Sequence, residues 1–209
     1  MSSFEIVEPG YEVATPQGPD EGMRMLRLIE RAARVCYRSE AKITDMSWEP
    51  LIKMLVKKKH TAMLEHDGYI SVLFTCDRGV SHELVRHRIA SFAQESTRYC
   101  NYGGKPVKVI QPPLERPSDR IHWRCSVSMA CEQYQVLISG GVKPQMARSV
   151  LPTCTATQVF LSANPTEWRH IFRLRAAPDA HPQMYELMRP LLAELQARVP
   201  LLFDDIEVP

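Results

Sequence analysis

A dense group of polar side chains lies between Arg86 and Tyr99, in the stretch RHRIASFAQESTRY. Guanidinium groups, hydroxyls and an amide at this density are the donors and acceptors that bind a phosphate-bearing ligand. An exposed basic end of a helix would explain the arginines equally well, because cations interact favourably with the last carbonyl groups of a helix. The residue types alone leave both interpretations open.

The RHR triplet restricts the local structure. Successive residues of a helix turn by about 100°, so Arg86, His87 and Arg88 could not share one face of a continuing helix. Either the three side chains serve different partners, or the preceding helix ends near Val85 and the following chain is extended around an anion.

The elements that must position this stretch alternate between short strands and long helices. The hydrophobic patterns predict strands at 4–8, 69–75, 107–110 and 153–162. They predict helices at 21–37, from 47 to the basic KKKH, from about 81, at 119–139, at 164–175 and at 181–198, and a short helix that ends with ARSVLP at 147–152. Without a repeat or a flexible linker, we expect one α+β domain over residues 1–209.

Local signals mark several of these boundaries. Met25, Leu28, Ile29, Ala32 and Cys36 recur at helical spacing and predict the buried face of the first helix. Ser47 is a candidate cap for the second helix. The segment NPTEW predicts a helix start, with Asn164 as the cap, Pro165 at the first position and Glu167 reaching back. Pro190 is expected to kink the last helix.

Composition limits the classes of function. The chain is 44% hydrophobic and 24% charged, typical of a globular protein, and its net charge of +2 favours neither nucleic acid nor membrane as a partner. The N-terminal residues lack a signal-peptide pattern, so we expect a cytoplasmic protein. Six cysteines without a CxxC pair predict reduced thiols, with no disulfide and no metal site.

The triplet Arg86-His87-Arg88, followed by seven residues and Ser96, resembles the signature RHRx7S of the flavin-dependent thymidylate synthases. Arg98 and Tyr99, which follow Ser96 after one intervening residue, also match that family. Other segments resemble the family in the same order: HTAMLEH, SHELVRHR, ARSVLP and NPTEWRHIFRLRA. The resemblance covers roughly His60 to the last helix, and 32–37 also fits.

The resemblance implies the reductive methylation of dUMP to dTMP. The family takes the methylene group from 5,10-methylenetetrahydrofolate and reducing equivalents from NADPH through FAD. It also implies a small, largely antiparallel sheet with long helices, and a homotetramer with shared active sites.

Site residues follow by position in the family's motifs. The dUMP-binding residues are expected to be Glu83, Leu84, Val85, Arg86, Gln94, Glu95, Ser96, Thr97, Arg98, Arg148 and Arg175. The FAD-binding residues are expected to be His66, Gly68, Arg86, His87, Arg88, Gln94, Asn164, Pro165, Thr166 and His170. His170 stands where some members of the family carry asparagine.

Arg175 matches the family residue that activates the uracil ring. Carbon 5 of uracil is a poor nucleophile until negative charge enters the ring, for example by ionisation of N3. A cation held against that edge lowers the cost of ionisation, more so in a dry site.

The sequence lacks the residue patterns that several other types of chemistry require. No Ser-His-acid arrangement accompanies Ser96, so we expect this serine to position the nucleotide and not to act as a nucleophile. The sequence has no GxGxxG, no P-loop and no HExxH. NADPH is therefore expected to dock over the flavin without a Rossmann unit.

Two alternatives remain open. The basic KKKH and RHR segments, with Tyr99 and Tyr102 as stacking rings, would suit a module that binds single-stranded nucleic acid. A protein of the same fold without synthase activity would be a flavin-dependent NADPH oxidase.

Overall fold

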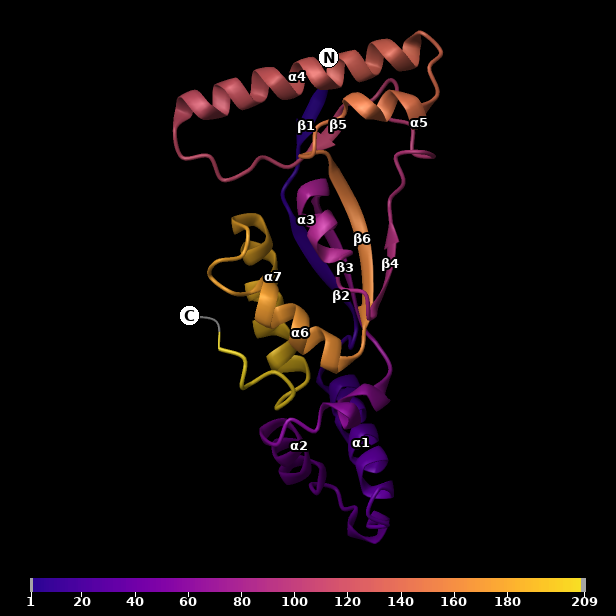
Figure 1. The fold of residues 1–209 in the computed structure, drawn as a ribbon, viewed down its shortest axis with the longest axis vertical. Helices are drawn as coiled ribbons and strands as arrows, with labels where there is room; N and C mark the ends of the chain where they lie inside the picture. Colours follow the sequence, from indigo (N-terminus) through magenta and orange to yellow (C-terminus); the bar gives the residue numbers. More distant parts are fainter. Residues whose placement is uncertain (1, 208–209) are drawn as a thin grey trace. The chain divides into compact units, whose positions relative to one another are not determined.

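The computed structural model describes residues 2–207 (Figure 1). Its strands are β1 Phe4–Ile6, β2 Gly10–Thr15, β3 Ile70–Asp77, β4 Ala90–Gln94, β5 Val107–Val109 and β6 Ala156–Ala163. Its α-helices are α1 Pro19–Val35, α2 Trp48–Lys57, α3 Arg78–Leu84, α4 Pro117–Ser139, α5 Pro144–Ala147, α6 Pro165–Arg175 and α7 Pro182–Arg198. Three 3-10 turns complete the order: η1 Glu40–Lys42, η2 Thr61–Asp67 and η3 Arg148–Val150.

The strands form two small sheets. β1 pairs in parallel with β5, so that Phe4 lies opposite Val107 and Ile6 opposite Val109. The other sheet has the strand order β2-β3-β6-β4. The expected mixed fold, with a small antiparallel sheet and long helices, is confirmed. The parallel β1–β5 pair is an addition that the sequence did not reveal.

The chain divides into two compact units, which we describe separately. The first unit comprises Met1–Gly10, Phe74–Arg86 and Ala93–Val159. The second unit comprises Tyr11–Leu73, His87–Phe92 and Phe160–Pro209. The extent of the single domain that we expected stays a prediction.

The core of the first unit lies where α4 packs on β1 and β5 (Figure 1). Val107 and Val109 of β5 meet Cys131 and Tyr134 of α4, and all four side chains are buried. The Tyr134 hydroxyl accepts a hydrogen bond from the Tyr102 amide at 3.2 Å. Each fully buried side chain of this size contributes about 1.5–3 kcal/mol of burial free energy, which anchors the long helix.

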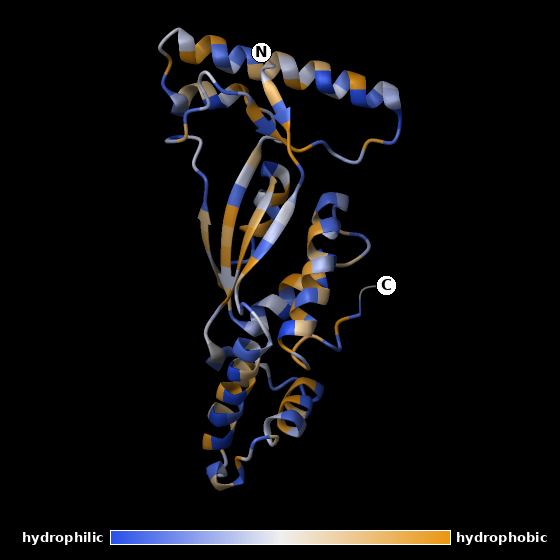
Figure 2. Cartoon of the chain, turned by 180° about the vertical axis from the view of Figure 1, so that it is seen from behind, coloured by the Kyte–Doolittle hydropathy of each residue, from blue (hydrophilic) through white to orange (hydrophobic). Residues whose placement is uncertain are grey.

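Hydrophobic and hydrophilic residues alternate along α1 (Figure 2), and the helix packs its mostly apolar face against α2 and α7 in the second unit. Leu26, Ile29 and Ala33 are buried there. The predicted face was therefore partly wrong, because Leu28 and Cys36 are exposed. Gly22 sets the true face: a Cβ atom there would lie 1.8 Å from the Arg198 carbonyl oxygen, so α7 approaches this side of α1 closely.

The helix that precedes RHR ends before the triplet begins. Asp77 caps α3 by accepting a hydrogen bond from the Val80 amide at 2.7 Å, so α3 begins three residues before the expected Ser81. α3 ends at Leu84, and β4 follows. The expected helix end near Val85 is confirmed, but residues 85–89 form turns and irregular backbone, and the extended chain begins only at Ala90. That this chain surrounds an anion stays a prediction. β4 itself was not predicted.

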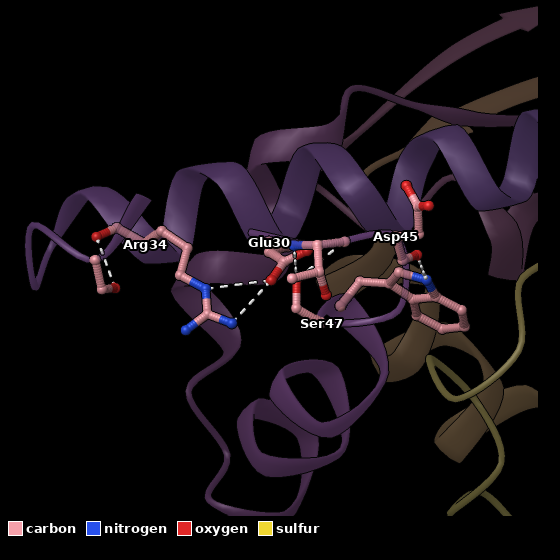
Figure 3. Close-up of polar contacts among 7 residues, drawn as sticks. Glu30, Arg34, Asp45 and Ser47 are labelled. Carbon is pink, nitrogen blue, oxygen red and sulfur yellow. Dashed lines mark hydrogen bonds and ion pairs between the residues drawn. The ribbon is translucent and has the colours of Figure 1, made fainter. Parts of the chain in front are cut away.

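Two predicted helix caps had different outcomes. Asn164 caps α6, since its side-chain oxygen accepts a hydrogen bond from the Glu167 amide at 2.8 Å. Ser47 precedes α2 but does not cap it; its hydroxyl instead accepts from the Thr44 amide at 2.7 Å (Figure 3). The position of the α2 start was right and its capping contact was wrong.

The cysteines are free thiols, as expected. Cys76, Cys131 and Cys154 are buried, whereas Cys36 and Cys125 are exposed. Burial raises the pKa of the Cys76 thiol to about 12. Within residues 2–207, none of the helices combines the length and the apolar character that a membrane span requires.

Candidate functional site

A group of four polar side chains in the second unit joins the RHR triplet to α6. The Arg175 Nε–H donates a hydrogen bond to His87 Nε2 at 3.2 Å. His87 Nδ1 lies 3.4 Å from Glu167 Oε1. The ring of His170 meets the His87 ring edge to face, with centroids 5.6 Å apart. His87 thus lies among three side chains of one helix.

Burial sets the charge of this group. His87 is only 4% exposed, and its burial, reinforced by the neighbouring Arg175 and His170, lowers the pKa of the imidazole to about 4. The ring is therefore neutral near pH 7. Because Nε2 accepts from Arg175, the proton of the neutral ring belongs on Nδ1, facing Glu167. Burial raises the pKa of the Glu167 carboxyl, and His170 partly opposes that rise.

The same group offers three atoms of the types that ligate metals. One ligand atom each from His87, Glu167 and His170 lies within 4.8 Å of the others. A cation bound there would also face the Arg175 guanidinium beside His87, and like charges at this range repel. We therefore interpret the group as a hydrogen-bonded one.

The predicted flavin residues of the second unit differ in exposure. His66, Gly68, Arg88 and His170 are exposed, whereas the side chains of His87 and Pro165 are buried. Gly68 adopts a left-handed backbone with φ 78°, which favours glycine.

The start of α6 offers few free backbone donors. Pro165 has no N–H, and the Glu167 amide is already bound by the Asn164 side chain. The Thr166 hydroxyl donates to the Thr61 carbonyl at 2.8 Å, which ties α6 to the segment that leads to His66.

In the first unit, Gln94 and Glu95 have fixed partners. The Gln94 side-chain amide donates to the Ser81 hydroxyl at 2.9 Å. Glu95 accepts a hydrogen bond from the Tyr102 hydroxyl at 2.8 Å, and its backbone carbonyl accepts one from Arg78 at 3.1 Å. Burial and the Glu95 carboxylate raise the pKa of Tyr102. Glu95, Tyr102 and two lysines are among the residues lining a cavity of about 450 Å³.

Ser96 of the signature and its neighbours Thr97 and Arg98 also have defined partners in the first unit. The Arg148 guanidinium donates to the buried Thr97 hydroxyl at 3.3 Å, which joins ARSVLP to the signature. The Arg98 amide donates to the Ser96 hydroxyl at 3.3 Å, and the Arg98 guanidinium lies 5.4 Å from the centroid of the Tyr99 ring. Ser96 thus organises the local turn, consistent with a positioning role.

The remaining nucleotide residues lie at the end of α3. Leu84 is fully buried, Glu83 is half-buried, and Val85 and Arg86 are exposed. Leu84 can therefore offer a nucleotide only its backbone, whereas the Arg86 guanidinium is accessible.

The predicted residues fall into two sets. All of the predicted nucleotide residues except Arg175 belong to the first unit, and all of the predicted flavin residues except Arg86 and Gln94 belong to the second. Sequence reasoning missed the contact of Glu167 with His87, because it assigned that side chain to the helix cap. The i, i+3 spacing of Glu167 and His170 was the available signal, since it places both on one side of α6.

Comparison with known proteins identifies the family. Residues 22–201 match the family model described as thymidylate synthase complementing protein. The flavin-dependent thymidylate synthase of Geobacter sulfurreducens is 30% identical over 185 residues, covering 85% of this chain and 80% of that protein. The enzyme of the same name from Corynebacterium glutamicum is 30% identical over 198 residues, covering 87% and 79%.

Solved structures share the fold. The UMP/dUMP methylase PolB from Streptomyces cacaoi, bound with 5-Br dUMP, superposes with a TM-score of 0.76 at 23% identity, covering 96% of each chain. Thymidylate Synthase X from Helicobacter pylori, with FAD and dUMP, gives 0.74 at 22% identity, covering 95% of this chain and 98% of that one. The chain therefore belongs to the thymidylate synthase complementing protein family, that of the flavin-dependent thymidylate synthases.

Proposed function

We propose that this chain converts dUMP to dTMP as a flavin-dependent thymidylate synthase, with FAD, 5,10-methylenetetrahydrofolate and NADPH, and that Arg175 activates the uracil. Family membership over residues 22–201 supports the activity. The observation that carries the residue assignment is the hydrogen bond from Arg175 to a buried, neutral His87.

Arg175 supplies the positive charge that the reaction needs. Negative charge must enter the uracil ring before carbon 5 can attack, and a guanidinium held at the ring edge stabilises that charge. Its Nε–H is bound to His87. The terminal nitrogens of the fork are the groups that we assign to the uracil.

His87 and Glu167 position this arginine. A neutral imidazole accepts from Arg175 on one nitrogen and presents its other N–H to the Glu167 carboxylate. If His87 were protonated, both ring nitrogens would be donors and the contact from Arg175 would be lost. The depressed pKa of His87 therefore keeps the arginine oriented across the physiological range.

The other residues divide between the two ligands. Arg86, Ser96, Arg98 and Arg148 offer guanidinium forks and a hydroxyl to the dUMP phosphate. Bound FAD would carry hydride from NADPH to the transferred one-carbon unit.

The chain's own residues fit the flavin. The exposed Arg88 suits its pyrophosphate, and the exposed His66 and His170 suit its ring. We retain the whole predicted dUMP and FAD sets as the binding residues, with His87 contributing chiefly through its place beside Arg175.

The assembly and location that we propose follow from the family. The active sites are shared between chains of a homotetramer, and residues 1–209 form one synthase domain in the cytoplasm. Neither nucleic acid nor membrane is a partner in this proposal, in keeping with the net charge of +2.

An absorption spectrum of the purified protein, followed by product analysis, tests the function. We expect the flavin bands of bound FAD, and dTMP only when dUMP, methylenetetrahydrofolate and NADPH are all present. Reduction of the flavin by NADPH without any dTMP would identify an oxidase. Colourless protein that takes up no FAD, makes no dTMP and binds single-stranded DNA would favour the nucleic-acid module.

A further inference from the structure

A cationic groove lies in the second unit, where α1, α2 and the chain entering η2 come together. Its volume is about 770 Å³, within the range of roughly 300–1,000 Å³ typical of small-molecule sites. Leu51, Met54 and Leu55 follow one face of α2 and, with Met63, give the groove an apolar side. We call it the α1/α2 groove.

The polar residues of the α1/α2 groove are all neutral or basic. Arg34, Lys42, Lys58, Lys59 and His60 line it, and among its described lining residues there is no aspartate or glutamate. Arg34 is paired with the buried Glu30 at 2.9 Å (Figure 3). Lys42, Lys58 and Lys59 form no ion pair with any carboxylate in the described part of the chain. Because the net charge is only +2, this concentration of positive charge is local.

The backbone at Lys59 holds a lysine where glycine is the usual residue. Lys59 has φ 56°, its amide donates to the Val56 carbonyl at 3.1 Å, and the His60 amide donates to the Leu55 carbonyl at 2.9 Å. This is the helix-ending motif in which glycine is preferred, because a side chain in the left-handed region is strained. Arg38, which follows α1, has the same left-handed backbone with φ 46° but does not line the groove.

One hydrogen bond connects the groove to the residues assigned to the flavin. Thr61 lines the groove, and its carbonyl accepts the hydrogen bond from the Thr166 hydroxyl at the start of α6. Tyr37, whose side chain is 79% exposed, also lines the groove and presents an aromatic ring on which a planar group can stack. A ligand with an aromatic or apolar body and an anionic end matches this combination of walls and charges.

We propose that the α1/α2 groove binds the anionic end of one of the two co-substrates, and that Lys58 and Lys59 are its principal charges. The inference rests on the proposed function, because that function supplies two ligands of this chemistry. They are the glutamate carboxylates of the folate and the 2′-phosphate of NADPH. The bound end lies on the lysines, while the rest of the molecule extends along the apolar side toward Thr61.

The test compares Lys58→Gln/Lys59→Gly with Arg38→Gly as the matched control. Both variants replace a left-handed cation by glycine, so neither should unfold the protein, and equal or higher thermal midpoints would verify this. The KM is measured for methylenetetrahydrofolate with one and with three glutamates, and for NADPH and NADH, at saturating dUMP. Loss of two exposed charge contacts should raise one KM about tenfold, with kcat unchanged.

The two pairs of KM values distinguish the two possible sources of the anion. A rise confined to the triglutamate identifies the folate tail, and a rise for NADPH but not NADH identifies the 2′-phosphate. Arg38→Gly should match the wild type in both. Unchanged KM values in the double variant would overturn the inference and leave the synthase function intact. If the wild type makes no dTMP, the proposed synthase function is wrong. Calorimetric titration with NADPH and with folate triglutamate then tests the groove by itself. Equal affinities in the wild type and the double variant would overturn the proposal that the groove binds an anion.

Discussion

The buried, neutral His87 makes the stability of the protein depend on pH in a defined window. Burial lowers the pKa of His87 to about 4 in the folded protein, against about 6.5 in an unfolded chain. The unfolded state therefore binds more protons below pH 6.5. The contribution of His87 is complete above pH 6.5 and is lost as the pH falls from 6.5 to 4.

The size of this effect follows from the two pKa values. Between pH 7 and pH 5, the unfolded histidine becomes almost fully protonated while folded His87 stays mostly neutral, so the free energy of unfolding falls by about 2 kcal/mol through this residue. Other groups also titrate here. His87→Gln removes the titration and keeps an amide able both to accept from Arg175 and to donate to Glu167.

Urea unfolding of the wild type and His87→Gln at pH 7 and pH 5 measures the difference. We expect the wild type to lose about 2 kcal/mol more than the variant over this interval. The groups that face His87 are Arg175, His170 and Glu167, and all three are retained in both proteins. Equal losses in the two proteins would refute the claim that His87 is held neutral by burial.

Three further substitutions test separate parts of the account. Arg88→Ala, at an exposed position, should leave stability unchanged but weaken flavin retention, measured as FAD per chain after gel filtration; full occupancy would remove Arg88 from the site. Gly22→Ala, which places Cβ 1.8 Å from a carbonyl oxygen of α7, should lower the free energy of unfolding by about 2 kcal/mol or more; the control Gly10→Ala, with open space around its Cβ, should change little. Asp77→Ala removes the cap of α3 and should cost about 1–2 kcal/mol in urea unfolding; an unchanged midpoint would contradict the capping role.

The sequence predicted the elements with strong local signals. Asn164 and Pro165 placed the start of α6 correctly, because a cap and a proline act within one turn of the chain. The long α4 and its end at the glycine pair were equally clear. β4 was not predicted because the segment ASFAQ has little intrinsic preference for a strand. This segment forms a strand only because it pairs with β6.

For the candidate site, the sequence predicted a set of residues but none of the contacts among them. The signature and its companion segments gave the residues through the family resemblance. The approach of His87 to Arg175 and Glu167 joins positions some 80 residues apart in the chain. Neither periodicity nor capping rules act over such a separation, so Glu167 was assigned to its own helix end.

The most direct test of the central claim is dTMP formation by Arg175→Ala compared with the wild type, with FAD content measured on the same samples. Arg173→Ala is the matched control, because Arg173 is on the same helix, is more than half exposed and lies 3.7 Å from Asp205. We predict that Arg175→Ala keeps its FAD while dTMP formation falls by at least about a hundredfold, and that Arg173→Ala retains activity. Full synthase activity in Arg175→Ala would contradict the claim that this guanidinium activates the uracil.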